Sequence, residues 1–179
     1  GIKKFVLKAD PTELKKELQA QINKIKSLGI KPTHIDSHEG ALFFNKEHFR
    51  VYLEVGEENK LPVFVPRGVD AHFGKGFPKP KNVVVIKDLY MARKGLKKTK
   101  WKEFYLNTIR GLKPGISQLI VHLSYDDNEM REISIDHPDY GAKWRHLDYE
   151  AVTNISFKKA LKQNDIKLVT WKEIQKVLY

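Results

Sequence analysis

The stretch DPTELKKELQAQINKIKSLGIKPTHID, residues 10–36, predicts a helix that leads directly into a strand. Asp10 is of a residue type that caps helices, and Glu13 stands where a capping box places its acid. Apolar residues then recur at helical spacing, at Leu14, Leu18, Ile22 and Ile25. Gly29 is of the type that ends helices, and residues 30–36 continue as a strand. One apolar helix face beside a strand is the building unit of α/β folds.

The rest of the chain continues this alternation of strands and helices. Further strands are predicted at residues 61–65, 83–86, 119–123 and 166–169. Further helices are predicted from the caps Asn45 and Thr170, and around residues 101–112 and 157–161. The run at residues 83–86 is apolar at every position, as expected of a strand that is covered on both faces. These features predict a single α/β domain, residues 1–179, with parallel strands.

The number of predicted strands is too small for a closed parallel barrel, which needs about eight. The sheet is therefore expected to be open, or to form an incomplete or distorted (β/α) barrel. Two long segments, residues 68–82 and 124–153, lack a continuous helix or strand pattern and are expected to run over the surface. Long loops of this kind in compact domains are often functional.

The composition excludes several classes of protein. The chain contains no cysteine, so disulfide frameworks and thiolate metal sites are excluded, and any metal must be held by His, Asp or Glu. No apolar run is long enough to span a membrane. The net charge of +11 comes mostly from lysines spread over helix surfaces, so nucleic acid is not the expected partner. The sequence leaves open whether the protein is cytoplasmic or exported, and it is compatible with a homodimer.

Two histidines and an aspartate occur at every second position in PTHIDSHEG, residues 32–40. Alternate residues of a strand point to the same face, so His34, Asp36 and His38 are expected to converge on one point at the end of a strand. Imidazole and carboxylate groups together are ligands for a divalent metal ion. The alternative is that one histidine caps a loop while the other packs, and that Asp36 bonds nearby backbone amides.

Three other strand ends carry polar side chains that are expected to face the same space. His122 stands near the end of the strand in LIVHLS, Arg67 follows the strand in LPVFVP, and Asp88 follows the apolar strand at residues 83–86. Metal-assisted hydrolysis requires three groups that face one cavity. They are a metal ion, a histidine that transfers protons, and a cation. The alternative for His122 is a hydrogen-bonded histidine within the core.

The segment from Asp10 through Phe43 resembles the YdjC-like (ChbG) carbohydrate deacetylases, and PTHIDSH is its most specific part. LIVHLS, RHLDYEAVTNISFKKAL and KLVTWKEI resemble later parts of the same family, so the likeness covers nearly the whole chain. The family is related to polysaccharide deacetylases. The resemblance implies a distorted barrel of the glycoside hydrolase and deacetylase type. It also implies that N-acetyl groups are removed from amino sugars or chitooligosaccharides with one divalent metal ion, magnesium or zinc.

The resemblance further implies roles for individual residues. His38 would be a metal ligand, and His34 would be a second ligand. Asp36 would be a metal ligand, or it would orient a histidine that is one. It would also be one of the catalytic groups. His122 would be the general acid that protonates the departing amine. Arg67 would hold the catalytic carboxylate or the carbonyl oxygen of the substrate.

Aromatic and basic side chains in residues 137–149 are candidates for binding the sugar by stacking and hydrogen bonding. They are Tyr140, Trp144, Arg145 and Tyr149. The alternative for the aromatic residues is ordinary packing within a loop. The expected partner is thus an N-acetylated oligosaccharide or an amino sugar.

The family pattern begins with a strand that ends in an Asp-Asp pair, and no such pair precedes His34. The chain therefore looks like the C-terminal portion of a longer enzyme, and alone it is expected to hold metal weakly and to lack turnover. Two other functions suit the same residues. One is another metallohydrolase, such as a phosphoesterase, and the other is a non-catalytic module that binds carbohydrate or a polyanion.

Overall fold

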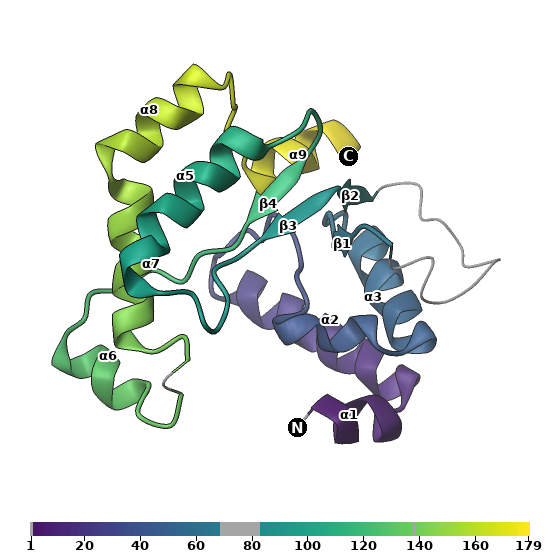
Figure 1. Cartoon of the computed structure of the whole chain (residues 1–179). Helices are drawn as coiled ribbons and strands as arrows, with labels where there is room; N and C mark the ends of the chain where they lie inside the picture. The colour runs from purple at the N-terminus through teal and green to yellow at the C-terminus, as the bar shows by residue number, and fades with distance from the viewer. Residues whose placement is uncertain (1, 69–82, 138) are drawn as a thin grey trace. The chain divides into compact units, whose positions relative to one another are not determined.

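The computed structural model describes residues 2–68, 83–137 and 139–179. Over these residues the chain forms two compact units, each with its own apolar core (Figure 1). The first unit is Gly1–Ile86 together with Val169–Tyr179, and the second unit is Lys87–Leu168. The single domain predicted from the sequence stays a prediction.

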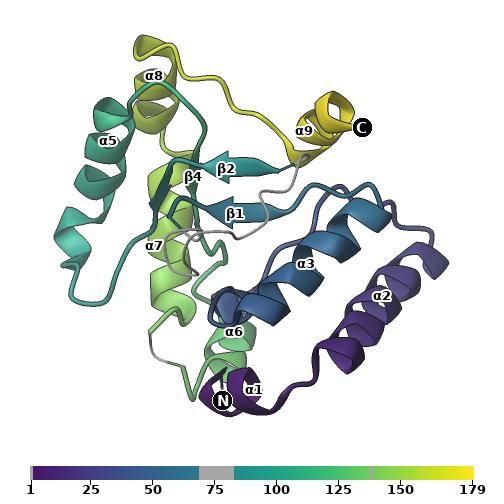
Figure 2. The ribbon, with the colours of Figure 1, turned by 90° about the vertical axis from the view of Figure 1, so that its right-hand side faces the viewer.

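The first unit consists of helices that share a core with a short parallel sheet. Its helices are α1 (Ile2–Lys8), α2 (Pro11–Ser27), the 3-10 helix η1 (His38–Phe43), α3 (Lys46–Glu58) and α9 (Trp171–Leu178). Strands β1 (Phe64–Pro66) and β2 (Val84–Ile86) pair in parallel. Helices α2 and α3 lie side by side (Figure 2), and their apolar faces share the core with Val63 and Val65.

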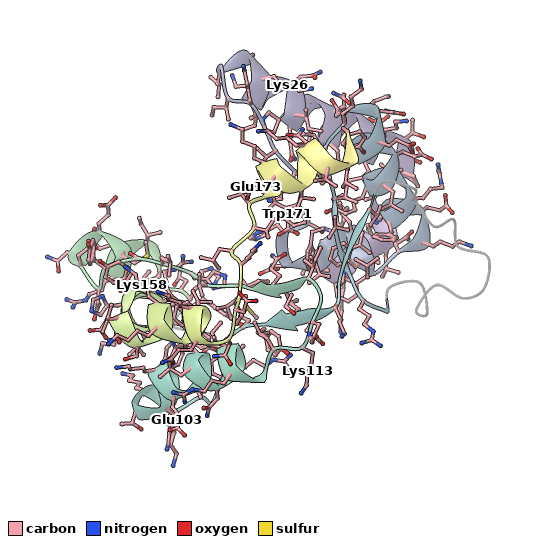
Figure 3. The ribbon with its side chains drawn as sticks, turned by 90° about the horizontal axis from the view of Figure 1, so that it is seen from above. Lys26, Glu103, Lys113, Lys158, Trp171 and Glu173 are labelled. Carbon is pink, nitrogen blue, oxygen red and sulfur yellow. The ribbon has the colours of Figure 1, made fainter. Side chains whose placement is uncertain are left out.

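Side chains that cap the helix starts define where three of these helices begin, as predicted. Asp10 accepts hydrogen bonds from two backbone N–H groups of the first turn of α2, at 2.9 and 3.1 Å. Asn45 accepts two such bonds at the start of α3. Thr170 forms a full capping box with Glu173, which lies beside Trp171 in the first turn of α9 (Figure 3). Each cap satisfies donors that a helix end otherwise leaves unpaired.

The capping box that the sequence predicts at Glu13 is wrong. The Glu13 carboxylate pairs instead with the Lys16 ammonium at 2.7 Å, on the exposed face of α2. The apolar stripe is buried only in part, because Ile25 near the end of the helix is exposed. Gly29 follows the helix with φ +77°, a conformation that glycine adopts without strain, so the predicted stop is confirmed.

The strand predicted at residues 30–36 is reduced to a single bridge between Ile35 and Val63. The buried hydroxyl of Tyr52 takes part in this pairing. It donates to the carbonyl of Ile35 at 2.8 Å and accepts the N–H of Phe64 at 3.1 Å. The N–H of Phe64 also donates directly to the carbonyl of Ile35 at 3.3 Å, so the hydroxyl adds to a backbone pairing that is limited to this one bridge.

Gly56 on α3 is the point where this helix comes closest to the chain that leads into β1. A Cβ atom at this position would overlap with Cγ1 of Val63 and would lie 3.0 Å from the carbonyl oxygen of Leu61. We expect Gly56→Ala to lower the free energy of unfolding by about 1–3 kcal/mol. The added methyl group would have no room between helix α3 and the chain at Val63. Urea unfolding measures the change.

Gly111→Ala is the matched control, because a Cβ at Gly111 on helix α5 (Trp101–Gly111) meets nothing within 4 Å. This variant should be as stable as the parent or slightly more stable, since alanine favours helix over glycine. Equal stability of the two variants would show that helix α3 does not approach Val63 as closely as described.

The second unit combines another short parallel sheet with a group of helices. Its strands are β3 (Asp88–Tyr90) and β4 (Ser117–Leu119), and they pair with Asp88 opposite Ser117. Its helices are the 3-10 helix η2 (Lys98–Lys100), α5, α6 (Asn128–Ile133), α7 (Ala142–Thr153) and α8 (Ile155–Gln163). Helix α5 packs against α7 and α8, and Trp101, Tyr105 and Phe157 are buried between them.

Several segments of the second unit differ from the prediction. Residues 124–153, predicted to lack regular structure, contain α6 and α7. Residues 166–169 form no strand. Strand β4 ends at Leu119, so His122 lies beyond the strand and not within it. Asp88 begins β3, so it stands at the amino end of a strand, where the sequence had placed it at a carboxyl end.

The α/β class with parallel strands is confirmed, and the barrel is not. Over the described residues the strands form two separate two-stranded sheets, β1 with β2 and β3 with β4. Val85 in β2 is exposed, so the expectation that this strand is covered on both faces is wrong. The loop predicted at residues 68–82 lies outside the described residues from position 69 onward. Among the described residues, no helix combines the length and apolar character that crossing a membrane requires.

Candidate functional site

The first histidine of the PTHIDSHEG motif, His34, packs against the C-terminal helix of the first unit. The ring of His34 stacks on the indole of Trp171, with centroids 4.6 Å apart and an interplanar angle of 4°. Its Nδ1 lies 3.2 Å from the hydroxyl oxygen of Thr33. Loss of water contact under the indole lowers the pKa of His34, although the charge of Asp36 acts in the opposite direction. The imidazole is thereby kept neutral, the form that binds metal ions.

The backbone is still extended at Ser37, and it turns after His38, where Glu39 and Gly40 have positive φ angles. The Asp36 carboxylate accepts the N–H of Ser37 at 2.7 Å, and the buried hydroxyl of Ser37 accepts the N–H of Leu42 at 3.0 Å. Withdrawal of water raises the pKa of Asp36, and the Ser37 hydrogen bond and both motif histidines oppose that rise. His38 then begins η1 with an exposed side chain. His38 thus lies beyond the single strand-like bridge at Ile35, in the first position of η1.

The motif supplies groups with the chemistry of metal ligands, but it does not form a complete metal site. Among residues 2–68, 83–137 and 139–179, no group of three or more His, Asp or Glu side chains is placed to hold a metal ion. The predicted convergence of His34, Asp36 and His38 on one point is therefore not found in these residues. The described residues do not by themselves fit a divalent ion, because such an ion needs four or more ligands.

Arg67 stands where the sequence predicts, directly after β1 of the first unit. Its backbone N–H donates to the carbonyl of Ile86 at 3.0 Å, which continues the parallel pairing by one residue. Its side chain is exposed, and within the described residues its guanidinium makes no ion pair. A fixed backbone with an exposed guanidinium leaves the side chain able to meet an anionic or carbonyl oxygen.

His122 belongs to the second unit and is held there through its backbone. Its N–H donates to Oδ2 of Asp148 at 3.0 Å, and its ring lies 5.2 Å from the ring of Tyr140. Burial lowers the pKa of His122, the nearby Arg145 cation lowers it further, and the charge of Asp148 partly opposes both. The buried Nδ1 has no hydrogen-bond partner among the residues that the structure describes. The ring is thus neutral and has one nitrogen without a fixed partner.

Asp148 is the residue of this site that the sequence reasoning missed. Its side chain is only 1% exposed. Oδ1 accepts the indole N–H of Trp101 at 2.8 Å and the hydroxyl of Tyr105 at 2.5 Å, while Oδ2 accepts the N–H of His122. Burial raises the pKa of Tyr105, and its hydrogen bond to Asp148 raises it further. Asp148 falls four residues after Trp144 on α7, and this helical spacing from a core tryptophan could have identified it.

Of the four residues predicted to bind the sugar, Tyr140 and Arg145 lie beside His122, and Trp144 packs against Tyr140. Tyr140 packs on Trp144 with ring centroids 4.4 Å apart, and Arg145 donates from Nε to the carbonyl of Tyr140 at 2.7 Å. Trp144 is 9% exposed and packs edge-on against Trp101 in the core, so little of its surface can meet a ligand. Tyr140 and Arg145 are half-buried and stand closer to solvent. Their role in binding stays a prediction.

We expect Arg145→Gln to raise the pKa of His122 toward its ordinary value of 6.5, because the substitution removes the cation that disfavours protonation. In the parent the unfolded state binds more protons below pH 6.5, so stability falls as the pH is lowered through that value toward the folded pKa. The variant should lose part of this dependence. NMR titration of the imidazole measures the change, and Arg145→Lys, which keeps the charge, should leave the pKa low.

Comparisons with known proteins agree with the motifs. Residues 1–163 match the model of the family described as YdjC-like protein. A carbohydrate deacetylase from Thermoanaerobacter pseudethanolicus is 27% identical over 164 residues, which are 91% of this chain and 60% of that protein. The crystal structure of a proposed cellobiose-phosphate cleavage protein from Enterococcus faecalis has a TM-score of 0.72 and 20% sequence identity, over 95% of this chain and 63% of that one.

The chain spans less than two thirds of the length of both of these proteins. The likeness to the Enterococcus faecalis structure shows a shared fold. The family match is more specific, because it begins at residue 1 and includes both the PTHIDSHEG motif and His122. The resemblance noticed in these two motifs is thereby confirmed, and the chain belongs to the YdjC-like family.

Proposed function

We propose that this chain is part of a carbohydrate deacetylase, a hydrolase that removes N-acetyl groups from amino sugars or chitooligosaccharides. The observation that carries the proposal is the 27% identity with a carbohydrate deacetylase over 91% of the chain. The environment of His122 supports it, because hydrolysis of an amide requires a group that delivers a proton to the departing amine.

His122 suits this task because its imidazole ring can both take up a proton and release it. Because its pKa is lowered, the ring is neutral near pH 7 and can first accept a proton as the attacking water loses one. The imidazolium formed can then give that proton to the amine nitrogen as the carbon–nitrogen bond breaks. Asp148 fixes the backbone of His122 and stabilises the transient positive charge, while Arg145 promotes release of the proton.

The proposed roles of the remaining residues are assigned within each unit separately. Tyr140 and Arg145 stand beside His122 and would meet the sugar ring that carries the acetamide. Arg67 would bind a carbonyl or carboxylate oxygen, and Asp36 is retained as a catalytic carboxyl group. Trp144 would support the ring of Tyr140 more than it would contact the sugar, because it is nearly covered.

A divalent ion, magnesium or zinc, remains part of the proposal. His38 and His34 are the ligands that this chain offers, because the first is exposed and the second is held as a neutral imidazole. The remaining ligands would come from outside the described residues. The exposed position of His38 also allows the side chain to reorient when other ligands are present.

The proposal is tested by release of acetate. This chain and the product of the full reading frame that encodes it are incubated with oligomers of N-acetylglucosamine, with and without a chelator and added magnesium or zinc. We expect acetate release by the full product, loss of release with chelator, and recovery with one of the two metals. Hydrolysis of an aryl phosphate without acetate release would instead indicate a phosphoesterase, and binding of sugar without either reaction would indicate a non-catalytic module.

A further inference from the structure

Helix α5 presents two hydrogen-bond donors to a single carboxylate oxygen in the second unit. Trp101 and Tyr105 are four residues apart on α5, so their side chains lie on the same face of the helix. The indole N–H and the phenolic hydroxyl both donate to Oδ1 of Asp148 on α7, at 2.8 and 2.5 Å. All three residues are almost fully buried. Packing and hydrogen bonds therefore fix this arrangement together.

The other oxygen of the same carboxylate faces the candidate site. Oδ2 of Asp148 accepts the backbone N–H of His122 at 3.0 Å. Because the two oxygens belong to one planar group, donors that hold Oδ1 also set the position of Oδ2. Helix α5 therefore acts on His122 through Asp148, although the proposed reaction itself uses neither Trp101 nor Tyr105.

The Tyr105 hydroxyl also connects the segments that follow the two strands of this unit. The backbone of Ala92, two residues beyond β3, forms a hydrogen bond with this hydroxyl. Next to it, the N–H of Ile120 beyond β4 donates to the carbonyl of Tyr90 at 2.8 Å. Through Asp148 the same hydroxyl is linked to His122, three residues beyond β4. Tyr105 thus joins both strand ends to the candidate site.

The surroundings of α5 do not call for a carboxylate on grounds of stability. Ile109, Phe157 and Ala160 are buried in the same core, which is otherwise mostly apolar. A buried charge loses its contact with water, and apolar side chains of similar size often serve a core equally well. The placement of Asp148, with one oxygen bonded to two core donors and the other to His122, favours a role in the candidate site.

The charge of Asp148 acts on the ring of His122 as well as on its backbone. Burial lowers the pKa of His122, the Arg145 cation lowers it further, and the charge of Asp148 opposes both. Both charged residues lie on α7, and Tyr140 is the titratable group whose ring lies beside His122. Hydrogen bonds to a carboxylate stabilise its charged form. The two donors on α5 therefore support the charge that favours the imidazolium of His122.

We propose that Trp101 and Tyr105 are positioning residues of the candidate site, which hold the Asp148 carboxylate where it fixes His122 and stabilises the imidazolium form of its ring. Each acts through Asp148, so neither is a catalytic residue. The use of that imidazolium in proton transfer rests on the proposed deacetylase function, which the inference extends to a second helix.

The test is NMR titration of the His122 imidazole in the parent chain, in Tyr105→Phe and in Trp101→Phe. Each variant removes one donor to Oδ1 of Asp148 and keeps an aromatic ring in the core. We expect each to lower the pKa of His122 by about 0.3–1, opposite in direction to the effect of Arg145→Gln. In the product of the full reading frame, kcat for acetate release should fall about threefold to tenfold while KM stays unchanged. The acidic limb of the pH profile should move to lower pH.

Thr108→Val is the matched control, because the Thr108 hydroxyl lies on the same helix but donates to the carbonyl of Phe104 at 2.9 Å. This variant should leave the pKa of His122 unchanged, even where it changes the melting temperature. Thermal unfolding checks that each variant is folded, and if one phenylalanine variant is not, the other decides.

The outcomes separate this inference from the proposed function. If the pKa of His122 is the same in the parent and in the folded phenylalanine variants, or if Thr108→Val shifts it equally, the positioning role is wrong and the deacetylase stands. If the full product releases no acetate, the deacetylase fails, and the titration alone decides the positioning role.

Discussion

Asp148→Ala is expected to lower the free energy of unfolding by about 3–5 kcal/mol, because three donors lose their acceptor at once. These donors are the indole N–H of Trp101, the hydroxyl of Tyr105 and the backbone N–H of His122. The carboxylate is almost fully buried, so water reaches none of the three easily. Urea unfolding, monitored by tryptophan fluorescence, measures the loss.

Two further variants show whether the hydrogen bonds or the size of the side chain matter. Asp148→Asn keeps the shape but offers one acceptor oxygen, so it should lose about half as much stability as the alanine variant. Glu150→Ala, two residues further along α7, removes an exposed carboxylate and should change stability by less than about 0.5 kcal/mol. A loss below about 1 kcal/mol for Asp148→Ala would contradict the buried three-donor arrangement.

Helix starts could be predicted from the sequence because a cap is a local arrangement. The bonds made by Asp10, Asn45 and Thr170 all reach residues two or three positions further along the chain. Neighbouring sequence therefore contains everything that determines them. Glu13 shows the limit of such reasoning, since Lys16 on the same helix competed for its carboxylate.

Strands could not be predicted as well, because a strand exists only where a distant segment pairs with it. The apolar pattern of residues 166–169 resembles a strand, but the described residues offer it no partner. At Ile35 the partner is present, but the pairing is limited to one bridge, to which the hydroxyl of Tyr52 adds its own hydrogen bonds. Neither outcome can be seen in the segment itself.

The candidate site was predictable in its residue types and less so in its geometry. PTHIDSH and His122 were enough to identify the family, which the comparisons confirm. The stacking of His34 on Trp171 depends on how the C-terminal helix folds back within the first unit. The sequence did not predict a role for Asp148, because a single acidic residue in a charged sequence usually lies on the surface. Its burial follows from three partners, two of which lie on α5.

His122→Asn in the product of the full reading frame is expected to lower kcat for deacetylation by about 10²–10⁴-fold, the usual contribution of a group that transfers protons in the transition state. KM should change little, because Tyr140 and Arg145 remain to bind the sugar. The remaining activity should also lose the part of its pH dependence that titration of His122 causes. Acetate release measured across the pH range tests both points.

The effect of His122→Asn on activity can be separated from the effect of Asp148→Ala on stability. Asp148 bonds to the backbone N–H of His122 and not to its ring. The substitution leaves that N–H bond in place, so the variant should unfold at nearly the same urea concentration as the parent, unlike Asp148→Ala. His137→Asn is the matched control, since His137 is exposed on the same unit and should keep full activity. If His122→Asn retained more than a tenth of the parent kcat, a different group would have to protonate the amine.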